Sequence, residues 1–190
     1  MIFKILWAIR ALIYKPFFGK FRFPSYIGKP TFIKNSAQIY IDKNVRIYPH
    51  SRIECISSMA KVIINENVTI GHSLHLTAHS ILEVSKNCII SSNVLITDNR
   101  HDYRDVDKNI LDQKLIIKKT FLGENCFIGK GAVIDAGTQL GRHCVVGANS
   151  VLSGVYPDYS VIVGAPGKII KRYDKAIKKW RVTNELGNFE

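Results

Sequence analysis

The sequence predicts an all-β fold, a parallel β-solenoid, and three observations predict it. Residues 122–157 divide into six consecutive units of six residues, and each unit opens with a large aliphatic residue. The fifth position is usually small, and the second is often glycine. A six-residue period is too short for a helical-hairpin repeat and too regular for a sandwich of unrelated strands. Each unit is therefore expected to form one side of a triangular coil, with three units to a turn.

The position within a unit predicts the environment of each residue. The openers are expected to point inward and stack in aliphatic ladders; they are Leu122, Ile128, Ile134, Leu140, Val146 and Leu152. The fifth positions are expected to face a tight interior; they are Cys126, Ala132, Thr138, Cys144 and Ser150. The second-position glycines are expected at corners with positive φ; they are Gly123, Gly129, Gly141 and Gly147.

The same period extends backward with irregularities, so one β-helix domain is expected over residues 23–167 of the 190-residue chain. The polar, charge-rich segment 97–119 has no period and is expected to leave the coil as a loop or arm. Gly164 to Gly167 ends the solenoid ahead of a basic tail, residues 168–190, for which a helix is expected.

Residues 1–22 are expected to form an amphipathic helix. Apolar residues recur there at helical spacing, with Lys and Arg between them and no acidic residue. The apolar run is far short of the ~20 residues that span a bilayer. Two interpretations stay open and are compatible: contact with the inner face of the cytoplasmic membrane, or packing on the solenoid or a neighbouring subunit.

The charge is concentrated at the two ends of the chain. Residues 1–22 contribute +5 and residues 168–181 contribute +6, so that +11 of the net charge of +12 lies outside the solenoid. This distribution does not describe a protein coated by nucleic acid. The four cysteines, Cys55, Cys88, Cys126 and Cys144, form no metal-binding or redox motif. Buried, reduced thiols are expected, which favours a reducing compartment and a cytoplasmic location.

His101 is the strongest candidate for chemistry. It lies where the solenoid runs into the aperiodic segment, and Asp98 and Asp102 are close to it in sequence. An imidazole oriented by an acid or a carbonyl can act as a general base toward a hydroxyl. Taken alone, the spacing D-x-x-H-D is a weak signal, and an ordinary surface histidine is the alternative.

The repeats, the segment ITDNRHDY and the closing segment VYPDYSVIVGAPGKIIKRY together resemble the left-handed β-helix acyltransferases, in particular the sugar O-acetyltransferases of bacterial lipopolysaccharide and capsule synthesis. The resemblance covers residues 23–181. It implies a left-handed coil, a homotrimer, acetyl-CoA in the cleft between adjacent solenoids, and His101 as the base. It also implies that the N–H of Lys130 stabilises the oxyanion.

The same resemblance implies the remaining site residues. Ala148 and Ser153 would lie along the pantetheine, and Ala165 and Pro166 beside the ribose or adenine. Lys168 and Lys171, and also Arg172, are candidates for the CoA phosphates. Asp98 and Asp102 are candidates for orienting His101, and Asn99 and His72 for contacting the acceptor. Several small-sugar acetyltransferases place an asparagine where this chain has Gly71, so the identity of the acceptor does not carry over.

A zinc site is the main competing chemistry, because γ-class carbonic anhydrases share this solenoid. His72 and His75 lie three residues apart on one strand, where alternate side chains change faces, and His101 lies in a different context. We therefore expect no metal, and interpret His72, His75 and His79 as outer-face residues.

The sequence favours an acetyl-CoA-dependent O-acetyltransferase that modifies a surface-glycan sugar, free, nucleotide-linked or lipid-linked. Two alternatives stay open: N-acetylation of an amino sugar, and a noncatalytic β-helix that binds a glycan or scaffolds a complex.

Overall fold

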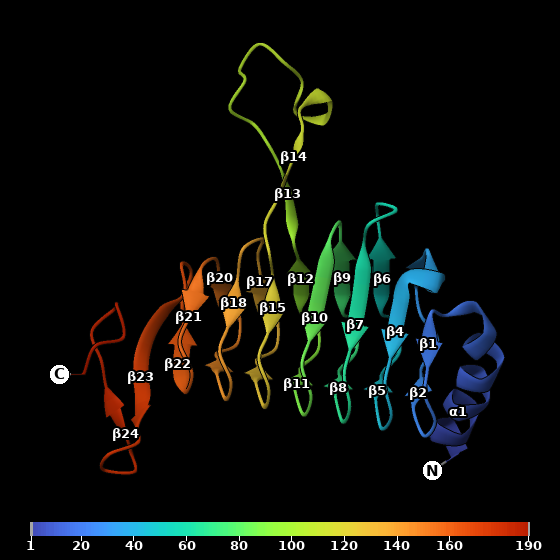
Figure 1. Cartoon of the computed structure of the whole chain (residues 1–190), viewed down its shortest axis with the longest axis horizontal. Helices are drawn as coiled ribbons and strands as arrows, with labels where there is room; N and C mark the ends of the chain where they lie inside the picture. Colours follow the sequence, from blue (N-terminus) through green and yellow to red (C-terminus); the bar gives the residue numbers. More distant parts are fainter. Residues whose placement is uncertain (1, 190) are drawn as a thin grey trace.

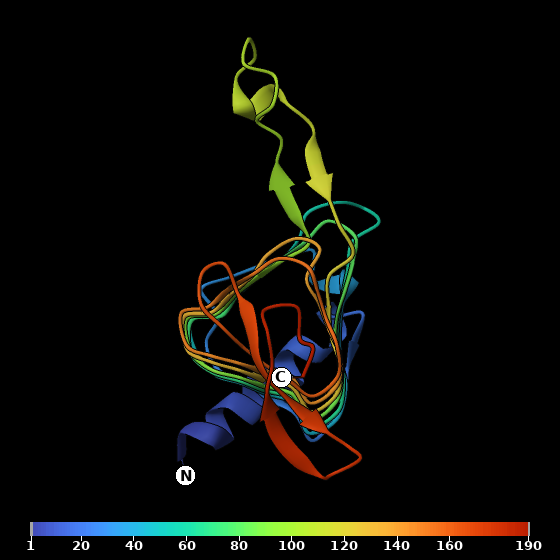
Figure 2. The same ribbon diagram turned by 90° about the vertical axis from the view of Figure 1, so that its left-hand side faces the viewer.

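A computed structural model describes residues 2–189 and shows a solenoid of short parallel strands, with a helix across its N-terminal end and an arm rising from its middle (Figure 1). The chain visits three sheets in turn, and these form the sides of a triangular coil (Figure 2). The predicted all-β solenoid is confirmed, as are the N-terminal helix and the protruding loop. The helix is shorter than predicted: it ends at Tyr14 and not at residue 22, and Lys20–Phe21 already form a strand that pairs with the next coil.

Neighbouring strands within each sheet belong to successive coils of the solenoid. Sheet A holds β1 (Lys20–Phe21), β4 (Ile39–Ile41), β7 (Lys61–Ile64), β10 (Ile81–Val84), β15 (Phe121–Leu122), β18 (Gln139–Leu140) and β21 (Val155–Tyr156). Sheet B holds β2 (Tyr26–Ile27), β5 (Arg46–Ile47), β8 (Thr69–Ile70), β11 (Ile89–Ile90), β16 (Phe127–Ile128), β19 (Val145–Val146), β22 (Ser160–Val163), β23 (Lys168–Asp174) and β24 (Lys179–Val182). Sheet C holds β3 (Phe32–Lys34), β6 (Arg52–Cys55), β9 (His75–Ala78), β12 (Leu95–Thr97), β17 (Val133–Ile134) and β20 (Val151–Leu152).

The remaining elements lie outside these three sheets. They are α1 (Ile2–Tyr14), the arm strands β13 (Asn99–His101) and β14 (Leu115–Ile117), and three short 3₁₀ turns, η1 (Lys15–Phe17), η2 (Ser36–Gln38) and η3 (Ile110–Asp112). Among the described residues, no helix is long and apolar enough to cross a membrane.

The core is the stack of inward side chains that the repeat predicts. All six unit openers of residues 122–157 are fully buried, and the five small fifth-position residues are at most 1% exposed. Strands of successive coils pair in parallel and in register, so that Ile96, Ile134 and Leu152 lie one above another. Burial of this continuous apolar column is the main stabilising contribution.

The prediction that the second-position glycines have positive φ is wrong. Left-handed conformations occur instead at the fourth positions, which are Asn125, Gly131, Gly137, His143 and Asn149. The second position needs glycine for another reason, because the next coil is too close: a Cβ on Gly129 would lie 2.6 Å from the backbone nitrogen of Ala148. Asparagine is the non-glycine residue that best tolerates the left-handed corner.

The predicted C-terminal helix is also wrong. Residues 168–174 form β23, which adds antiparallel to β22 and then pairs with β24. The last coil leaves the edge of sheet B open, and the tail satisfies the hydrogen bonds of that edge. Ile169 becomes buried, while Tyr173 stacks against Tyr159 and Trp180.

The four cysteines are buried and free, as predicted. Cys88, Cys126 and Cys144 occupy equivalent inward slots, where each thiol donates to a backbone carbonyl of the following coil. Burial raises the pKa of the Cys55 thiol to about 11.

Candidate active site

The outer face of sheet C lies next to the arm that carries His101, and its side chains point outward at alternate positions of each strand. Ile53, Leu76, Ile96, Ile134 and Leu152 point into the core. We define the outer face of sheet C by the alternate residues: Phe32, Arg52, Glu54, His75, Thr77, Leu95, Thr97, Val133 and Val151. Its N-terminal strands are polar and its C-terminal strands apolar. The arm leaves from β12 between them.

The arm is a hairpin that rises from the solenoid (Figures 1 and 2), and His101 is the last residue of its first strand, β13. β13 pairs antiparallel with β14, with His101 opposite Leu115, and the His101 side chain is exposed. Arg100 reaches back toward the next coil, where its guanidinium lies 3.9 Å from the carboxylate of Asp135. The base of the arm is thus tied to the coil that contains β17, and His101 is presented to solvent from a short ordered hairpin.

Asp98 makes no described hydrogen bond to the His101 ring. Its side chain is fully buried at the end of β12, and it accepts hydrogen bonds from the backbone N–H groups of His79 and Ser80 at 2.8 and 2.7 Å. The Ser80 hydroxyl and the Asn99 amide donate to it as well. Asp98 therefore fixes the start of the arm to the preceding coil. No sequence motif signals this, because the donors lie 18 and 19 residues away.

Asp102 is also engaged elsewhere. The Arg104 guanidinium donates two hydrogen bonds to its carboxylate, from Nε to Oδ1 at 2.8 Å and from Nη2 to Oδ2 at 2.5 Å. This guanidinium holds the pKa of Asp102 well below its usual range. Asn99, predicted to contact the acceptor, donates its amide to Asp98. The described hydrogen bonds therefore connect neither carboxylate to the His101 ring.

A polar cluster on the outer face of sheet C was missed at the level of sequence. Arg52 Nε donates to Glu54 at 2.5 Å, His75 Nε2 lies 3.4 Å from the same carboxylate oxygen, and the Thr77 hydroxyl lies 3.2 Å from His75 Nε2. The Glu54 side chain is only 11% exposed although it points outward. The hydrogen bond from Arg52 lowers the pKa of Glu54. The interpretation of His75 as an outer-face residue holds, but its partners include a residue of another coil.

Lys130, Ala148 and His72 lie along one corner of the solenoid. Each is the second residue after a strand of sheet B, namely β16, β19 and β8. The Asn149 N–H donates to the Lys130 carbonyl at 2.9 Å, which links two of these corners. Among the hydrogen bonds of the described residues, the Lys130 N–H donates none. His72 stacks edge-on against Tyr48, and its own N–H donates to Ser92.

The other donor-side candidates surround the last coil. Ser153 follows β20 at the opposite edge of sheet C, whereas exposed Ala165 and Pro166 continue the corner of Lys130 and Ala148. Lys168 pairs with Glu185 at 2.5 Å, and Arg172 donates to the Gly187 carbonyl at 3.1 Å. Lys171 is exposed on β23. These three basic residues thus lie on strands, not on the predicted helix.

Two further features bear on the chemistry. Within residues 2–189, no group of three or more His, Cys, Asp or Glu side chains is arranged to hold a metal ion. A hollow of about 640 Å³ lies on the sheet A side of the arm base; it is lined by Ser80, Ile81, Glu83, Ser85, Lys119, Thr120 and Phe121.

Comparison with known proteins agrees with the repeat. Residues 119–154 match the family model described as bacterial transferase hexapeptide (six repeats). The putative lipopolysaccharide biosynthesis O-acetyl transferase WbbJ of Escherichia coli is 28% identical over 158 residues, which cover 80% of both chains. A probable acetyltransferase of Mycobacterium tuberculosis is 31% identical over 106 residues, 56% of this chain, and this chain spans only 35% of its length.

Solved structures show the same fold. AntD, an N-acyltransferase from Bacillus cereus solved with dTDP and 3-hydroxybutyryl-CoA, superposes with a TM-score of 0.77 at 22% identity, covering 88% of this chain and 90% of that one. The polySia-specific acetyltransferase NeuO superposes with a TM-score of 0.62 at 22% identity, covering 78% of this chain and 68% of that one. The repeat, the coil geometry and these relatives agree: residues 119–154 carry six bacterial transferase hexapeptide repeats, and the chain shares the fold of acyltransferases of this kind.

Proposed function

We propose that this protein is an acetyl-CoA-dependent O-acetyltransferase that acetylates a sugar hydroxyl during synthesis of a bacterial surface polysaccharide. The observation that carries the proposal is His101, an exposed imidazole on an ordered hairpin at the boundary between the polar and apolar parts of the sheet C outer face. Likeness to the E. coli O-acetyl transferase over 80% of both chains supports the reaction class.

His101 would act as general base in a direct transfer. Its neutral ring nitrogen takes the proton of the sugar hydroxyl as that oxygen attacks the thioester carbonyl. The tetrahedral intermediate then collapses, the C–S bond breaks, and the imidazolium returns its proton to the departing CoA thiolate. Asp98 serves as a positioning residue in this scheme, because it holds β13 against the preceding coil.

The N–H of Lys130 is the proposed donor to the oxyanion, since it is not used by the fold. Within one chain, however, Lys130 precedes a strand of sheet C, β17, whereas the arm follows a strand of the same sheet, β12. The two therefore lie at opposite edges of sheet C. We therefore propose that the Lys130 corner of a neighbouring copy faces His101, so that the active site is shared between protomers. A closed homotrimer of three-sided solenoids meets this requirement.

The proposed path of acetyl-CoA follows the last coils. Ala148 and Ser153 flank the apolar C-terminal part of the sheet C outer face, which suits the pantetheine arm. Ala165 and Pro166 lie where the ribose or adenine would end, and Lys171 is placed to meet a phosphate. To bind a CoA phosphate, Lys168 would have to break its ion pair with Glu185, and Arg172 its hydrogen bond to the Gly187 carbonyl.

The polar cluster Arg52, Glu54, His75 and Thr77 is the proposed acceptor subsite, together with His72 at the adjoining corner. Charged groups held in fixed positions recognise several sugar hydroxyls at once. Replacing Glu54 by Gln is expected to raise KM for the acceptor while acetyl-CoA binding is unchanged. An equal loss of both affinities would show a structural role instead. This position of the acceptor subsite is compatible with a lipid-linked acceptor at the inner face of the cytoplasmic membrane.

The central experiment compares wild type with H101A, using acetyl-CoA binding by calorimetry and CoA release by a free-thiol assay. We expect H101A to bind acetyl-CoA normally and to lose about 10²- to 10⁴-fold in turnover. The control is H143N, because His143 is exposed with positive φ at a corner between sheets A and B, away from the arm, and asparagine tolerates that conformation. Absence of acetyl-CoA binding by wild type would favour the noncatalytic scaffold.

The nature of the new bond separates O- from N-acetylation. An acetyl ester formed on a sugar hydroxyl is removed by mild base, whereas an acetamide survives the same treatment. We expect a base-labile product with hydroxyl acceptors. A base-stable product formed only from amino sugars would favour N-acetylation, the reaction class of the AntD structures.

A further inference from the structure

Helix α1 presents its apolar side to solvent. Trp7 and Ala8 are partly buried and Ala11 is buried, so their side of the helix faces the first coil, where Trp7 packs against Tyr26 and Tyr48. The opposite side carries large aliphatic residues at the spacing i, i+1, i+4, i+7, i+8 that forms one helix face. They are Ile5 (56% exposed), Leu6 (51%), Ile9 (49%), Leu12 (57%) and Ile13 (60%). A helix on a water-facing surface normally has the reverse arrangement.

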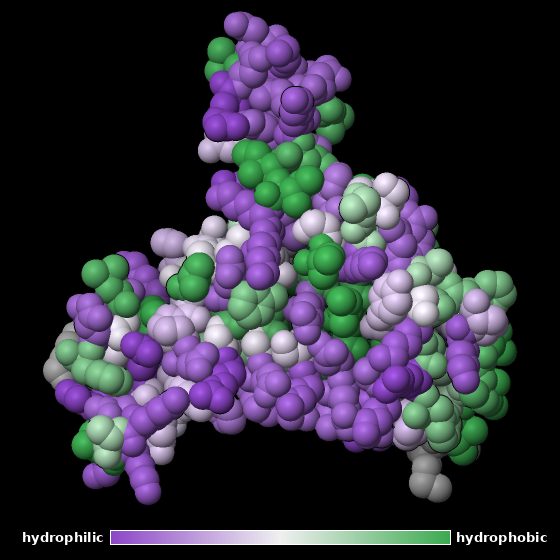
Figure 3. Space-filling model, in the orientation of Figure 1, coloured by the Kyte–Doolittle hydropathy of each residue, from purple (hydrophilic) through white to green (hydrophobic). Residues whose placement is uncertain are grey.

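The apolar surface continues beyond the helix. Phe3 and Phe17 are 71% and 64% exposed. A groove of about 400 Å³ runs from the end of α1 onto the first coil, lined by Tyr14, Phe17, Phe18, Pro30, Thr31, Phe32, Ile33 and Ser36. Figure 3 shows hydrophobic side chains gathered at this end of the solenoid. We call the exposed apolar side chains of α1, together with Phe17, the N-terminal apolar face. A contiguous face of this kind marks a site of interaction.

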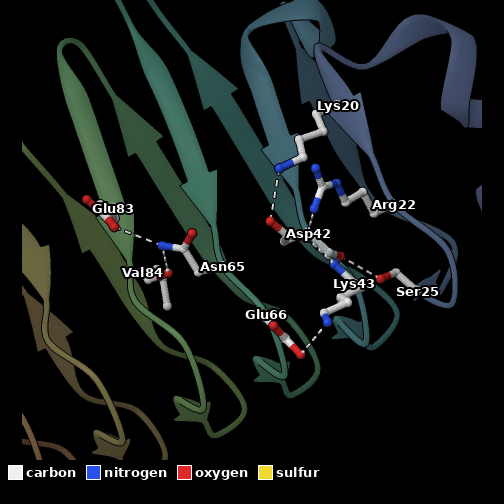
Figure 4. A network of polar contacts seen from close by, with 9 residues as sticks. All are labelled: Lys20, Arg22, Ser25, Asp42, Lys43, Asn65, Glu66, Glu83 and Val84. Atoms are coloured by element: carbon white, nitrogen blue, oxygen red, sulfur yellow. Dashed lines mark hydrogen bonds and ion pairs between the residues drawn. The ribbon is translucent and has the colours of Figure 1, made fainter.

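The positive charge around the N-terminal apolar face favours an anionic partner. The first acidic residue of the chain is Asp42, and seven Lys or Arg residues precede it. Asp42 lies 2.9 Å from Lys20 and 3.4 Å from Arg22, so it offsets those two cations (Figure 4). Lys4, in the first turn of α1, and Lys15, directly after its last residue, are exposed. A second copy would bring the same cations against each other, whereas an anionic surface complements them.

We propose that the N-terminal apolar face binds the surface of an anionic lipid bilayer. Helix α1 lies in the plane of the interface with Ile5, Ile9 and Ile13 among the acyl chains. Lys4 and Lys15 extend to the headgroups, as long basic side chains do at such boundaries. Because α1 crosses the end of the solenoid (Figure 1), the coils then rise away from the membrane. This inference is independent of the proposed acetyl transfer.

The test is sedimentation of the full chain with vesicles of phosphatidylcholine alone or with one third phosphatidylglycerol. Wild type is expected to bind the anionic vesicles and to lose most of that binding at high salt. The double variant I9E/I13E is expected to bind at least tenfold more weakly, with its circular dichroism and melting temperature unchanged. The matched control, M59E/L186E, changes residues that are 77% and 81% exposed elsewhere and should bind as wild type does.

Each other outcome overturns the proposal. If wild type and I9E/I13E bind equally well, or if wild type binds neither kind of vesicle, the N-terminal apolar face does not mediate membrane binding. If wild type binds neutral and anionic vesicles equally well, the basic residues do not contribute to membrane binding. A change in molar mass of I9E/I13E by light scattering, with no change in vesicle binding, identifies a second copy of the chain as the occupant. Acetyl transfer to a soluble acceptor should persist in I9E/I13E, so failure of this proposal is distinguishable from failure of the proposed function.

Discussion

The solenoid and its arm follow opposite rules. In the solenoid, every sixth side chain is buried and each coil is locked to the next by parallel ladders. In the arm, Tyr103, Val106 and Leu111 are 70%, 90% and 77% exposed, and a two-stranded ladder holds the segment. The solenoid therefore supplies the stability of the protein, while the arm uses that rigid base to project His101. Stability and activity should respond to substitutions in different regions.

The largest effect on stability is expected from I134A. Ile134 is fully buried in the middle of sheet C, between Ile96 and Leu152 of the adjacent coils. Removing the side chain should cost about 2–5 kcal/mol of unfolding free energy, from lost burial and the cavity left behind. Urea unfolding followed by circular dichroism measures it. A loss as small as that of an exposed site would contradict the stacked core.

A somewhat smaller effect is expected from G129A. The added methyl would lie 2.6 Å from the backbone nitrogen of Ala148 and 2.7 Å from the carbonyl carbon of Gly147, so the coils must separate locally. Overpacking of this kind costs about 1–3 kcal/mol. The control is E124A in the preceding unit, which removes only an exposed ion pair with Lys86. Equal melting temperatures for the two variants would contradict the close-approach explanation.

Asp98 lies at the boundary between the two regions, and D98N tests how they are joined. An amide in place of the buried carboxylate would keep one acceptor oxygen but direct an NH₂ group at one of the backbone donors of His79 and Ser80. We expect a loss of about 1–3 kcal/mol, with faster hydrogen exchange in β13. D102N, whose partner Arg104 is exposed on the same arm, should leave thermal stability unchanged. Equal effects of the two variants would disprove the separate roles.

Changes at the tip of the arm should have almost no effect on stability. V106A and L111A remove side chains that are mostly exposed, so each should change the unfolding free energy by less than about 0.5 kcal/mol. Thermal melts of both variants check this. A larger loss would mean that the tip of the arm is buried against another copy of the chain.

The smallest expected effect concerns the reactivity of the Cys55 thiol, which reports whether the coil around it opens. With its pKa raised to about 11 by burial, the thiol stays protonated at pH 8, and only the thiolate attacks thiol reagents. A chromogenic disulfide should therefore label the native chain slowly and the urea-unfolded chain at once. Fast labelling of native wild type, abolished in C55A, would show that the coil opens readily.

The sequence by itself determined the features that depend on local repetition. The six-residue period determined the solenoid, the buried openers and the small fifth positions, because parallel in-register coils place equivalent residues in equivalent surroundings. It also determined that 97–119 leaves the coil, since a segment without the period cannot contribute to the stacked core. The helical spacing of residues 2–14 was sufficient to predict α1.

Only the tertiary structure decided which residues of different coils meet. Glu54 and His75 are 21 residues apart, and Asp98 bonds a coil 19 residues earlier, so no local pattern signals either contact. The tail forms β23 because the last coil leaves an open strand edge, and residues 168–174 pair with it instead of forming a helix. The second-position glycines are required by the distance to the next coil, a property of the stacked solenoid and not of the chain that coils into it.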